Sequence, residues 1–279
     1  MRPVAPLDTV HLFPPLREAL VALLRGLRDE DWERPTAAPL WRVRDVAAHL
    51  VDGDLRRLSF HRDRLPPLPP DRPIGGYRDL VGFLDAFNAK WVDAAHRLSP
   101  RLLTDLLAWT GPQVEAHLRT LDPDDPAVFS VAWAGDDWSP NWFDVAREYT
   151  ERWHHQQQIR DAVGAPPLTD RRWLHPTLDT FARGLPHAYR TTEAPDGAQV
   201  TVRITGPAGD AWTLARAGGD WKLFAGAAPA ASATVELDQD AAWRLFTKGL
   251  SPEAARGRLH VEGDARYAGP LLGYLAIMG

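Results

Sequence analysis

Residues 142–163 read WFDVAREYTERWHHQQQIRDAV, and this stretch carries the pattern that decides the fold. Apolar side chains recur with the period of an α-helix, about 100° per residue, and Gly164 and Pro166 end the run. The apolar stripe of the predicted helix consists of Trp142, Val145, Tyr149 and Trp153. The opposite stripe consists of Asp144, Glu148, Glu151 and His155. A helix with one apolar face has to bury it against other elements, which favours a helical domain.

A second predicted helix has the same two-sided pattern. It begins near Val43 and runs towards Arg64, where the proline-rich stretch LPPLPPDRP stops it. Its apolar stripe consists of Val43, Val46, Ala47, Leu50 and Leu58. Its polar stripe consists of Asp45, His49 and Asp52.

Two interpretations of these polar stripes compete. In the first, both are solvated helix faces, and the four-residue spacing of Glu151 and His155 has no function. In the second, the stripes face each other around a polar cavity and bring His49 to Glu151 and His155. Two imidazoles and a carboxylate are a familiar zinc-binding set that leaves a coordination position for substrate. The pattern alone leaves both open.

The remaining sequence predicts two domains. Further helices are expected over residues 9–31, 77–98, 101–121 and 171–190, with a loop rich in Asp, Pro and Gly between 121 and 140. After Thr192 short strand-like runs such as AQVTVRITG and ASATVELD alternate with turn residues. We therefore expect an all-α domain over residues 1–192 and a small α+β domain over residues 193–279.

Composition restricts the function classes. A formal net charge of −5 argues against a protein that binds nucleic acid or a membrane surface by electrostatics. No apolar run is long enough to span a membrane and the first residues lack a signal-peptide core, so a cytoplasmic location is expected. The chain has no cysteine, which excludes disulfides, zinc–thiolate clusters and a cysteine nucleophile. Any sulfur chemistry therefore requires a thiol brought in as a cosubstrate.

The chain resembles the mycothiol-dependent maleylpyruvate isomerase family, within the DinB-like metalloproteins. The family pattern W-x-V-x-D-x-x-x-H matches Trp41, Val43, Asp45 and His49, and its later E-x-x-x-H matches Glu151 and His155. The resemblance implies a DinB-like four-helix bundle that binds a divalent metal through His49, Glu151 and His155. The C-terminal stretches TVELDQDAAWRLFTKGL and LHVEGDARYAGPLLGYLAIM are similar to the sterol-carrier-like domain often fused behind this bundle.

The chain also departs from the family pattern. His154 lies three residues after Glu151 and is an alternative to His155 as a ligand, although the family spacing favours His155. Gln158 occupies the position at which the family often has an aspartate, so the surroundings of the ligands can differ. Catalytic residues other than ligands are not identified; His187, Tyr189 and Arg190 are weak candidates, and an amphipathic linker helix is the simpler interpretation of their segment.

The leading functional hypothesis is a metal-dependent enzyme with a low-molecular-weight, mycothiol-like thiol as cosubstrate. It is an isomerase or a thiol S-transferase that acts on small electrophiles. Zinc is the first choice of metal, and nickel, manganese and iron also suit histidine and glutamate ligands. The alternative is a non-catalytic, metal-containing binding protein for an apolar small molecule. The sequence leaves the oligomeric state open.

Overall fold

The computed structural model describes residues 1–71 and 73–277, which form two compact units. The helical unit comprises residues 8–129 and 140–167. The sheet unit comprises residues 1–7, 130–139 and 168–277. This division differs from the boundary expected at residues 192 and 193, because residues 168–192 pack with the sheet and not with the helices. Whether the chain divides at residues 192 and 193 into two parts that fold independently stays a prediction.

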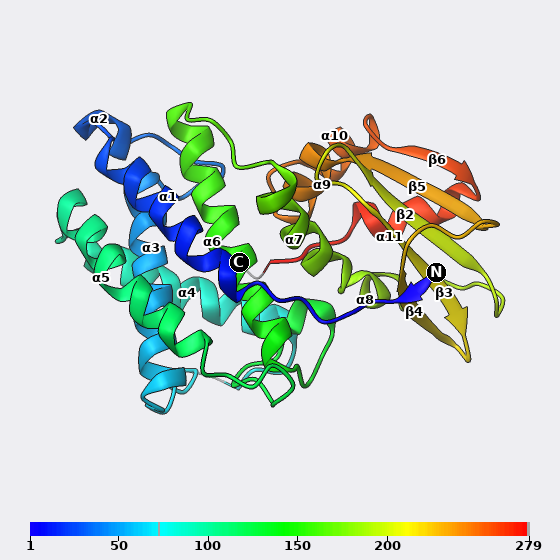
Figure 1. The fold of residues 1–279 in the computed structure, drawn as a ribbon, viewed down its shortest axis with the longest axis horizontal. Coiled ribbons are helices and arrows are strands. Elements are labelled where there is room, and N and C mark those ends of the chain that lie inside the picture. Colours follow the sequence, from blue (N-terminus) through cyan, green and yellow to red (C-terminus); the bar gives the residue numbers. More distant parts are fainter. Residues whose placement is uncertain (72, 278–279) are drawn as a thin grey trace. The chain divides into compact units, whose positions relative to one another are not determined.

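The helical unit is built from long helices joined by short segments (Figure 1). Its elements are η1 (Val10–Leu12), α1 (Phe13–Arg25), α2 (Asp29–Trp32), α3 (Val43–Arg56), η2 (Arg57–Arg62), α4 (Tyr77–Ala95), α5 (Pro100–Leu118) and α6 (Asn141–Val163). The helix expected over residues 9–31 is divided, because α1 ends before Gly26 and the short α2 follows. The helix expected from Val43 keeps its start, but it changes after Arg56 into the π-helical turn η2.

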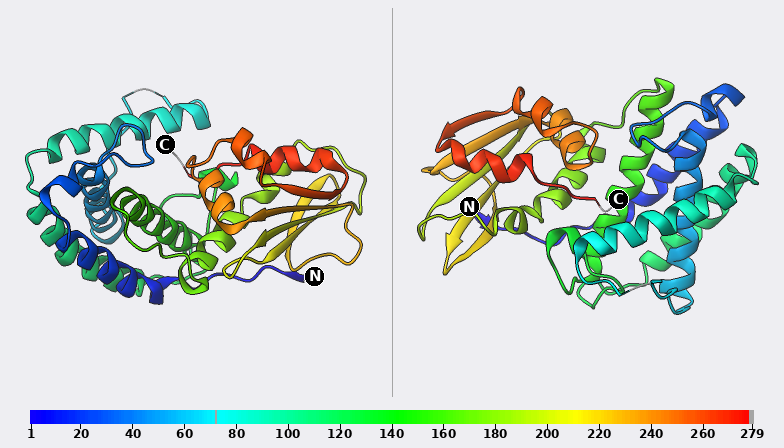
Figure 2. Two further views of the ribbon diagram at one scale, coloured as in Figure 1. Left: turned by 90° about the horizontal axis from the view of Figure 1, so that it is seen from above. Right: turned by 180° about the vertical axis from the view of Figure 1, so that it is seen from behind.

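Four helices, α1, α3, α5 and α6, pack side by side as a bundle, and α4 packs against α3 (Figure 2). The core that joins them includes Leu24 of α1, Val46 and Val51 of α3, Leu107 of α5 and Ile159 of α6. These side chains come from four helices and form one apolar core, so the predicted helical domain is confirmed. Across the described residues, no helix is both long enough and apolar enough to cross a membrane.

The polar stripes of α3 and α6 are buried and paired, not solvated. Arg57, at the start of η2, is 3% exposed and donates to Asp144 Oδ2 at 2.6 Å and to Glu148 Oε2 at 2.8 Å. Arg152 donates to Glu148 Oε1 at 2.9 Å and forms an ion pair with Asp54 at 2.6 Å. We call these five residues the α3–α6 ion network. The interpretation of the stripes as solvated faces is therefore wrong.

The sheet unit contains one mixed sheet with strand order β1-β4-β3-β2-β5-β6. The strands are β1 (Arg2–Pro3), β2 (Gln199–Thr205), β3 (Ala211–Ala217), β4 (Asp220–Ala225), β5 (Ala233–Asp238) and β6 (His260–Gly263). Strands β2 and β5 are parallel with Val202 opposite Val235, and the other pairs are antiparallel. The expected α+β character of this part is confirmed.

Short helices pack against this sheet within the same unit. They are η3 (Ala132–Ala134), α7 (Arg171–Ala182), α8 (Leu185–Tyr189), α9 (Gln239–Phe246), α10 (Pro252–Arg256), η4 (Ala265–Tyr267) and α11 (Ala268–Leu272). The single helix considered for residues 171–190 is divided at Gly184. There the Tyr274 hydroxyl donates to the carbonyl of Phe181 at 2.6 Å, and a Cβ at Gly184 would overlap that hydroxyl.

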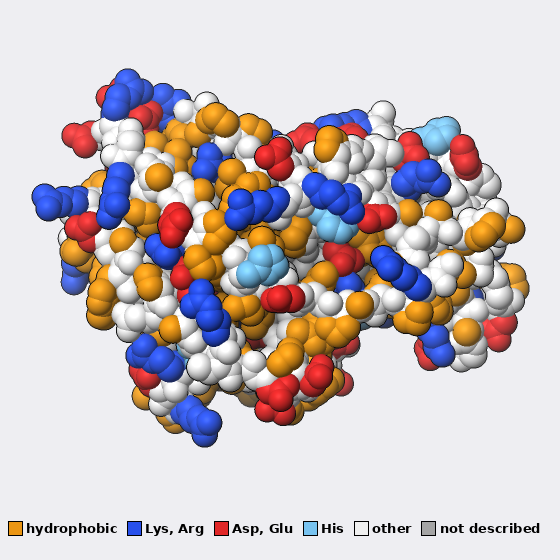
Figure 3. Space-filling view, viewed as in Figure 1, with side chains coloured by type: hydrophobic (Ala, Val, Ile, Leu, Met, Phe, Trp, Pro, Cys, Tyr) orange, Lys and Arg blue, Asp and Glu red, His pale blue; other side chains and the backbone are white. Residues whose placement is uncertain are grey.

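On the face of the helical unit drawn in Figure 3, basic and acidic side chains are interspersed. The helical unit contains ion pairs between neighbouring side chains, for example Arg28 with Glu30 at 2.6 Å and Arg42 with Glu33 at 2.5 Å. A mixed surface of this kind does not concentrate the positive potential that attracts a polyanion. The expectation that the protein does not bind nucleic acid or a membrane surface by electrostatics stays a prediction.

Substitution of Gly111 by alanine should destabilise the helical unit. Gly111 lies inside α5 against Arg17, and an added Cβ would overlap Arg17 Cδ. Arg17 cannot move freely, because its Nε donates to the buried Glu115 at 2.6 Å. We expect a loss of about 1–3 kcal/mol in the free energy of unfolding, measured by urea denaturation followed by circular dichroism.

Gly53→Ala is the matched control, since Gly53 lies inside α3 with nothing within 4 Å of an added Cβ. This substitution should be neutral or stabilise by about 0.5–1 kcal/mol, because alanine is the better helix former. Equal destabilisation by the two substitutions would contradict the proposed overlap.

Arg57→Met should destabilise the helical unit by about 3–5 kcal/mol, because it leaves buried carboxylates without their shared cation. Burial alone would raise the pKa of Asp144, but Arg57 and Arg147 lower it to about 2, below the ordinary 3.8. The same surroundings lower the pKa of Glu148 below its ordinary 4.5. Carboxylates with a lowered pKa stabilise the fold above the unfolded-state pKa, and this stability is lost as the pH falls.

The acid dependence provides the check on this prediction. Wild-type protein should lose stability as the pH falls from about 4.5 to about 2, a window set by the ordinary and folded-state pKa values. In Arg57→Met this loss should be smaller, because the pairing that lowered the pKa of Asp144 is gone. Thermal midpoints measured across pH 2–7 that run parallel in the two proteins would contradict the pairing.

Candidate metal centre

The first residue of the candidate centre, His49, is fixed by the start of α3. Asp45 Oδ2 accepts a hydrogen bond from the backbone N–H of Arg42 at 2.9 Å and so caps the helix. The Trp41 ring lies 4.9 Å from the His49 ring, centroid to centroid. Val43 is fully buried in the core. The spacing W-x-V-x-D-x-x-x-H therefore has a physical meaning: a packing aromatic, a core anchor and a helix cap hold the histidine.

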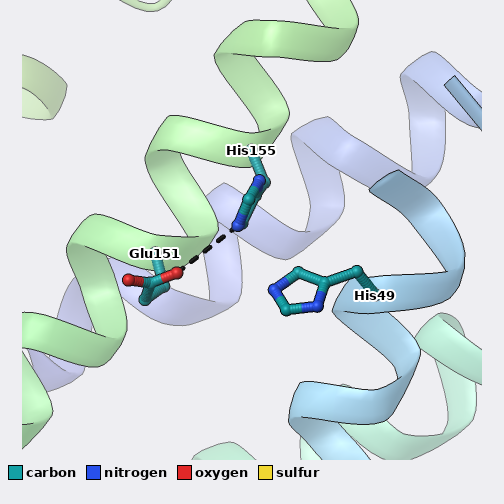
Figure 4. Close-up of side chains that lie close together, drawn as sticks. All are labelled: His49, Glu151 and His155. Carbon is teal, nitrogen blue, oxygen red and sulfur yellow. Dashed lines mark ion pairs between the residues drawn. The ribbon is translucent and has the colours of Figure 1, made fainter. Parts of the chain in front are cut away.

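Glu151 and His155 come from one face of α6 and meet His49 across the bundle. They are one helical turn apart, and Glu151 Oε2 lies 3.4 Å from His155 Nε2. One ligand atom of each of the three residues lies within 4.8 Å of the others. Figure 4 shows the His49 ring with one nitrogen turned towards Glu151 and His155. The structure thus brings together the three residues that the sequence singled out.

The neighbours of His155 distinguish it from His154. The Nδ1 of His155 lies 2.9 Å from Gln158 Oε1, an atom that can only accept, so Nδ1 carries the hydrogen. The Nε2 atom, which lies on the side of Glu151, then keeps its lone pair free for a metal. His154 is buried with its ring 4.8 Å from that of His155, but it is not part of the group of three. The geometry supports His155 over His154.

The electrostatic setting favours a neutral His49 and an ionised Glu151. Burial, reinforced by His155, lowers the pKa of His49 well below its ordinary 6.5. Burial alone would raise the pKa of Glu151, but the neighbouring His155 and the charge of Arg147 lower it to about 2. Neutral histidine and ionised glutamate are the forms in which these side chains bind metals.

These residues fit a divalent metal. They supply two imidazole nitrogens and one carboxylate, the set found in zinc sites with three protein ligands. The orientation of His155 is fixed by Gln158, as is usual for a histidine that binds a metal. Glu151 keeps 28% of its side chain exposed, so a small molecule can approach the centre from that side.

The other sequence candidates lie in the sheet unit. Tyr189 is fully buried and its hydroxyl donates to the carbonyl of Tyr267 at 2.7 Å. Arg190 is exposed and donates to the carbonyl of His187 at 2.6 Å. His187 packs against Gly135, where a Cβ would overlap its ring. These contacts lie within the sheet unit, and a catalytic role for the three residues stays a prediction.

Two features of the centre escaped the sequence analysis. Gln158 was noticed as a departure from a pattern, but its hydrogen bond to His155 was not expected. Its position three residues after His155 on a helix is the signal that could have indicated it. Arg57 was not considered at all, and in the sequence it does not differ from a surface arginine.

Comparison with solved structures supports the fold of the whole chain. A crystal structure of the mycothiol-dependent maleylpyruvate isomerase aligns with 87% of this chain and 88% of its own, at 10% identity and a TM-score of 0.52. A single-residue variant of that enzyme aligns with 94% of this chain and 95% of its own, at 10% identity and a TM-score of 0.53. At this identity the likeness concerns the fold alone.

The expected sterol-carrier-like character of the C-terminal part has weaker support. A ubiquinone synthesis protein, UbiJ-SCP2, aligns with 33% of this chain and 89% of its own at 17% identity, but its TM-score of 0.24 carries no argument. That character stays a prediction. None of the curated proteins compared with the chain matches it.

A match at the level of the family settles the relationship. The model of the mycothiol maleylpyruvate isomerase N-terminal domain matches residues 13–160, which is 148 of the 279 residues. This stretch contains His49, Glu151 and His155 and most of the helical unit. The chain therefore belongs to the mycothiol maleylpyruvate isomerase N-terminal domain family.

Proposed function

We propose that this protein is a metal-dependent enzyme that uses a low-molecular-weight thiol of the mycothiol type to transform small electrophiles. The observation that carries the proposal is the convergence of His49, Glu151 and His155 within 4.8 Å in a member of this family. Zinc is the first choice of metal, with nickel, manganese and iron as alternatives. A cytoplasmic location belongs to the same proposal.

The three residues suit thiol activation by charge. A divalent ion held by two neutral histidines and one carboxylate keeps a net charge of about +1 and favours the thiolate form of an incoming thiol. His49 and His155 would hold it through nitrogen lone pairs, and Glu151 through its carboxylate. Because the chain has no cysteine, the nucleophilic sulfur has to come from the cosubstrate.

The same thiolate can begin two reactions. In an isomerisation, a C–S bond forms at one carbon of an activated cis double bond while the electron pair moves to the activating carbonyl. Rotation about the resulting single bond and cleavage of the C–S bond then give the trans isomer and return the thiol. In an S-transfer, the C–S bond forms while a leaving group departs with its electron pair. The family relationship favours the isomerisation.

The alternative function, a carrier for an apolar molecule, is not favoured. Family membership points to a thiol-dependent enzyme. A cleft of about 430 Å³ in the sheet unit is lined partly by ionisable side chains, including His175, Asp179 and Asp210. A lining with several ionisable side chains suits a polar ligand better than an apolar one.

His49→Ala should abolish metal retention and leave the fold of the sheet unit intact, because His49 supplies one of three ligands and belongs to the helical unit. Metal content is measured by elemental analysis of the purified protein, and folding by circular dichroism. The control is His11→Ala, which removes an exposed histidine of the helical unit. Full metal occupancy in His49→Ala would exclude His49 as a ligand.

The reaction is tested by supplying the purified protein with maleylpyruvate and mycothiol, and with epoxide and halide electrophiles in parallel. We expect turnover that requires both the thiol and the metal. A chelator should therefore abolish it, added metal should restore it, and His49→Ala should reduce it by at least about 100-fold, the upper range for loss of a group that acts with the metal. Turnover that persists without thiol would refute the proposal.

A further inference from the structure

The hydrogen bond that His155 donates from Nδ1 is accepted by a neutral group, the side-chain amide of Gln158. His155 is 8% exposed and Gln158 is 6% exposed, and the 2.9 Å bond between Nδ1 and Oε1 is shielded from solvent. The amide oxygen accepts the Nδ1 hydrogen and therefore holds the tautomer in which Nε2 is free. It does so without adding negative charge.

His49 likewise has no carboxylate behind it. Its Nδ1 is buried, and none of the described residues forms a hydrogen bond with it. The ring is held instead by packing against Trp41 and His155, with centroid distances of 4.9 and 4.7 Å. Metal-binding histidines ordinarily donate the second N–H to a carboxylate, a backbone carbonyl or water.

Four carboxylates of α3 and α6 near the two histidines pair with arginines. Asp144 and Glu148 accept from Arg57, and Asp54 pairs with Arg152. Asp52, one turn after His49, pairs with Arg56 at 3.0 Å. These pairs keep the negative charge of α3 and α6 away from the second nitrogens of both histidines.

We infer that Gln158 is a positioning residue that fixes His155 for the metal and, as a neutral acceptor, keeps the charge on the bound ion high. A carboxylate in its place would make the imidazole more basic, bind the ion more tightly and reduce its attraction for a thiolate. The neutral amide gives looser metal binding and stronger thiolate binding. This inference rests on the proposed function, since it presupposes a metal at the centre.

The test uses the full-length protein with Gln158 replaced by Leu or by Glu, which are close to it in size. Gln157→Leu is the matched control, because Gln157 is also buried on α6 and its amide contacts Asp161 at 3.3 Å instead of His155. The dissociation constant for Zn²⁺ is measured by competition with a chelator. Thiol binding is measured on the Co²⁺-loaded proteins from the thiolate-to-cobalt absorption band.

For Gln158→Leu we expect Zn²⁺ binding weaker by about 10–100-fold, because the tautomer and orientation of His155 are no longer fixed. For Gln158→Glu we expect Zn²⁺ binding tighter by about 10-fold and thiol binding weaker, because the carboxylate offsets the charge of the ion. Gln157→Leu should keep both constants within about 2-fold of wild type, as a site without this contact should.

Zn²⁺ binding by Gln158→Leu within about 2-fold of wild type would overturn the positioning role. Parallel changes of metal and thiol affinity in Gln158→Glu would overturn the role of the neutral amide. If Gln158→Leu fails to fold, as thermal denaturation of the metal-free protein would show, the opposite shifts expected of Gln158→Glu decide the matter. Absence of metal binding in the wild type would instead refute the proposed function itself, so the two failures are distinguishable.

Discussion

The buried pairing of Arg57 with Asp144 and Glu148 is the constraint on which the arrangement of the helical unit depends. A guanidinium that is 3% exposed is stable only if its hydrogen bonds are satisfied, and these two carboxylates satisfy it at 2.6 and 2.8 Å. The two acceptors lie one turn apart on α6, so the forked donor group fixes both the rotation and the height of α6 relative to η2. Apolar packing alone tolerates more variation in both.

This constraint determines what the rest of the interface can hold. Along α6, Asp144, Glu148, Glu151 and His155 follow one another at intervals of four, three and four residues and share one face. Asp144 and Glu148 pair with Arg57. Glu151 and His155 therefore face α3 one and two turns further along α6. His49 precedes Arg57 by eight residues on the partner helix, so the register that pairs Arg57 also places His49 opposite Glu151 and His155. One part of the stripe thus forms buried ion pairs, and the next part holds the candidate metal ligands Glu151 and His155.

Sequence periodicity was sufficient to predict the two helices and their polar faces, and the family resemblance implied that His49, Glu151 and His155 converge. Periodicity could not show that Arg57 is buried, because the burial depends on two carboxylates of α6 that lie 87 and 91 residues further along the chain. The family spacing favoured His155 over His154, while the convergence of His155 with His49 depends on the packing of α3 against α6, which no local pattern encodes. The grouping of residues 168–192 with the sheet was missed for the same reason, since an amphipathic helix does not specify which layer covers its apolar face.

The charge balance of the interface connects its stability with its chemistry. Four arginines of this interface form ion pairs with an equal number of carboxylates. The arginines are Arg56, Arg57, Arg147 and Arg152, and the carboxylates are Asp52, Asp54, Asp144 and Glu148. Glu151 is the acidic side chain of this stripe that pairs only with a histidine. With neutral histidines, the centre alone therefore carries a charge of about −1, and a divalent ion would convert it to about +1 without disturbing the network. Because these arginines and carboxylates already pair with one another, Glu151 is left as the carboxylate of this stripe that can bind a divalent ion.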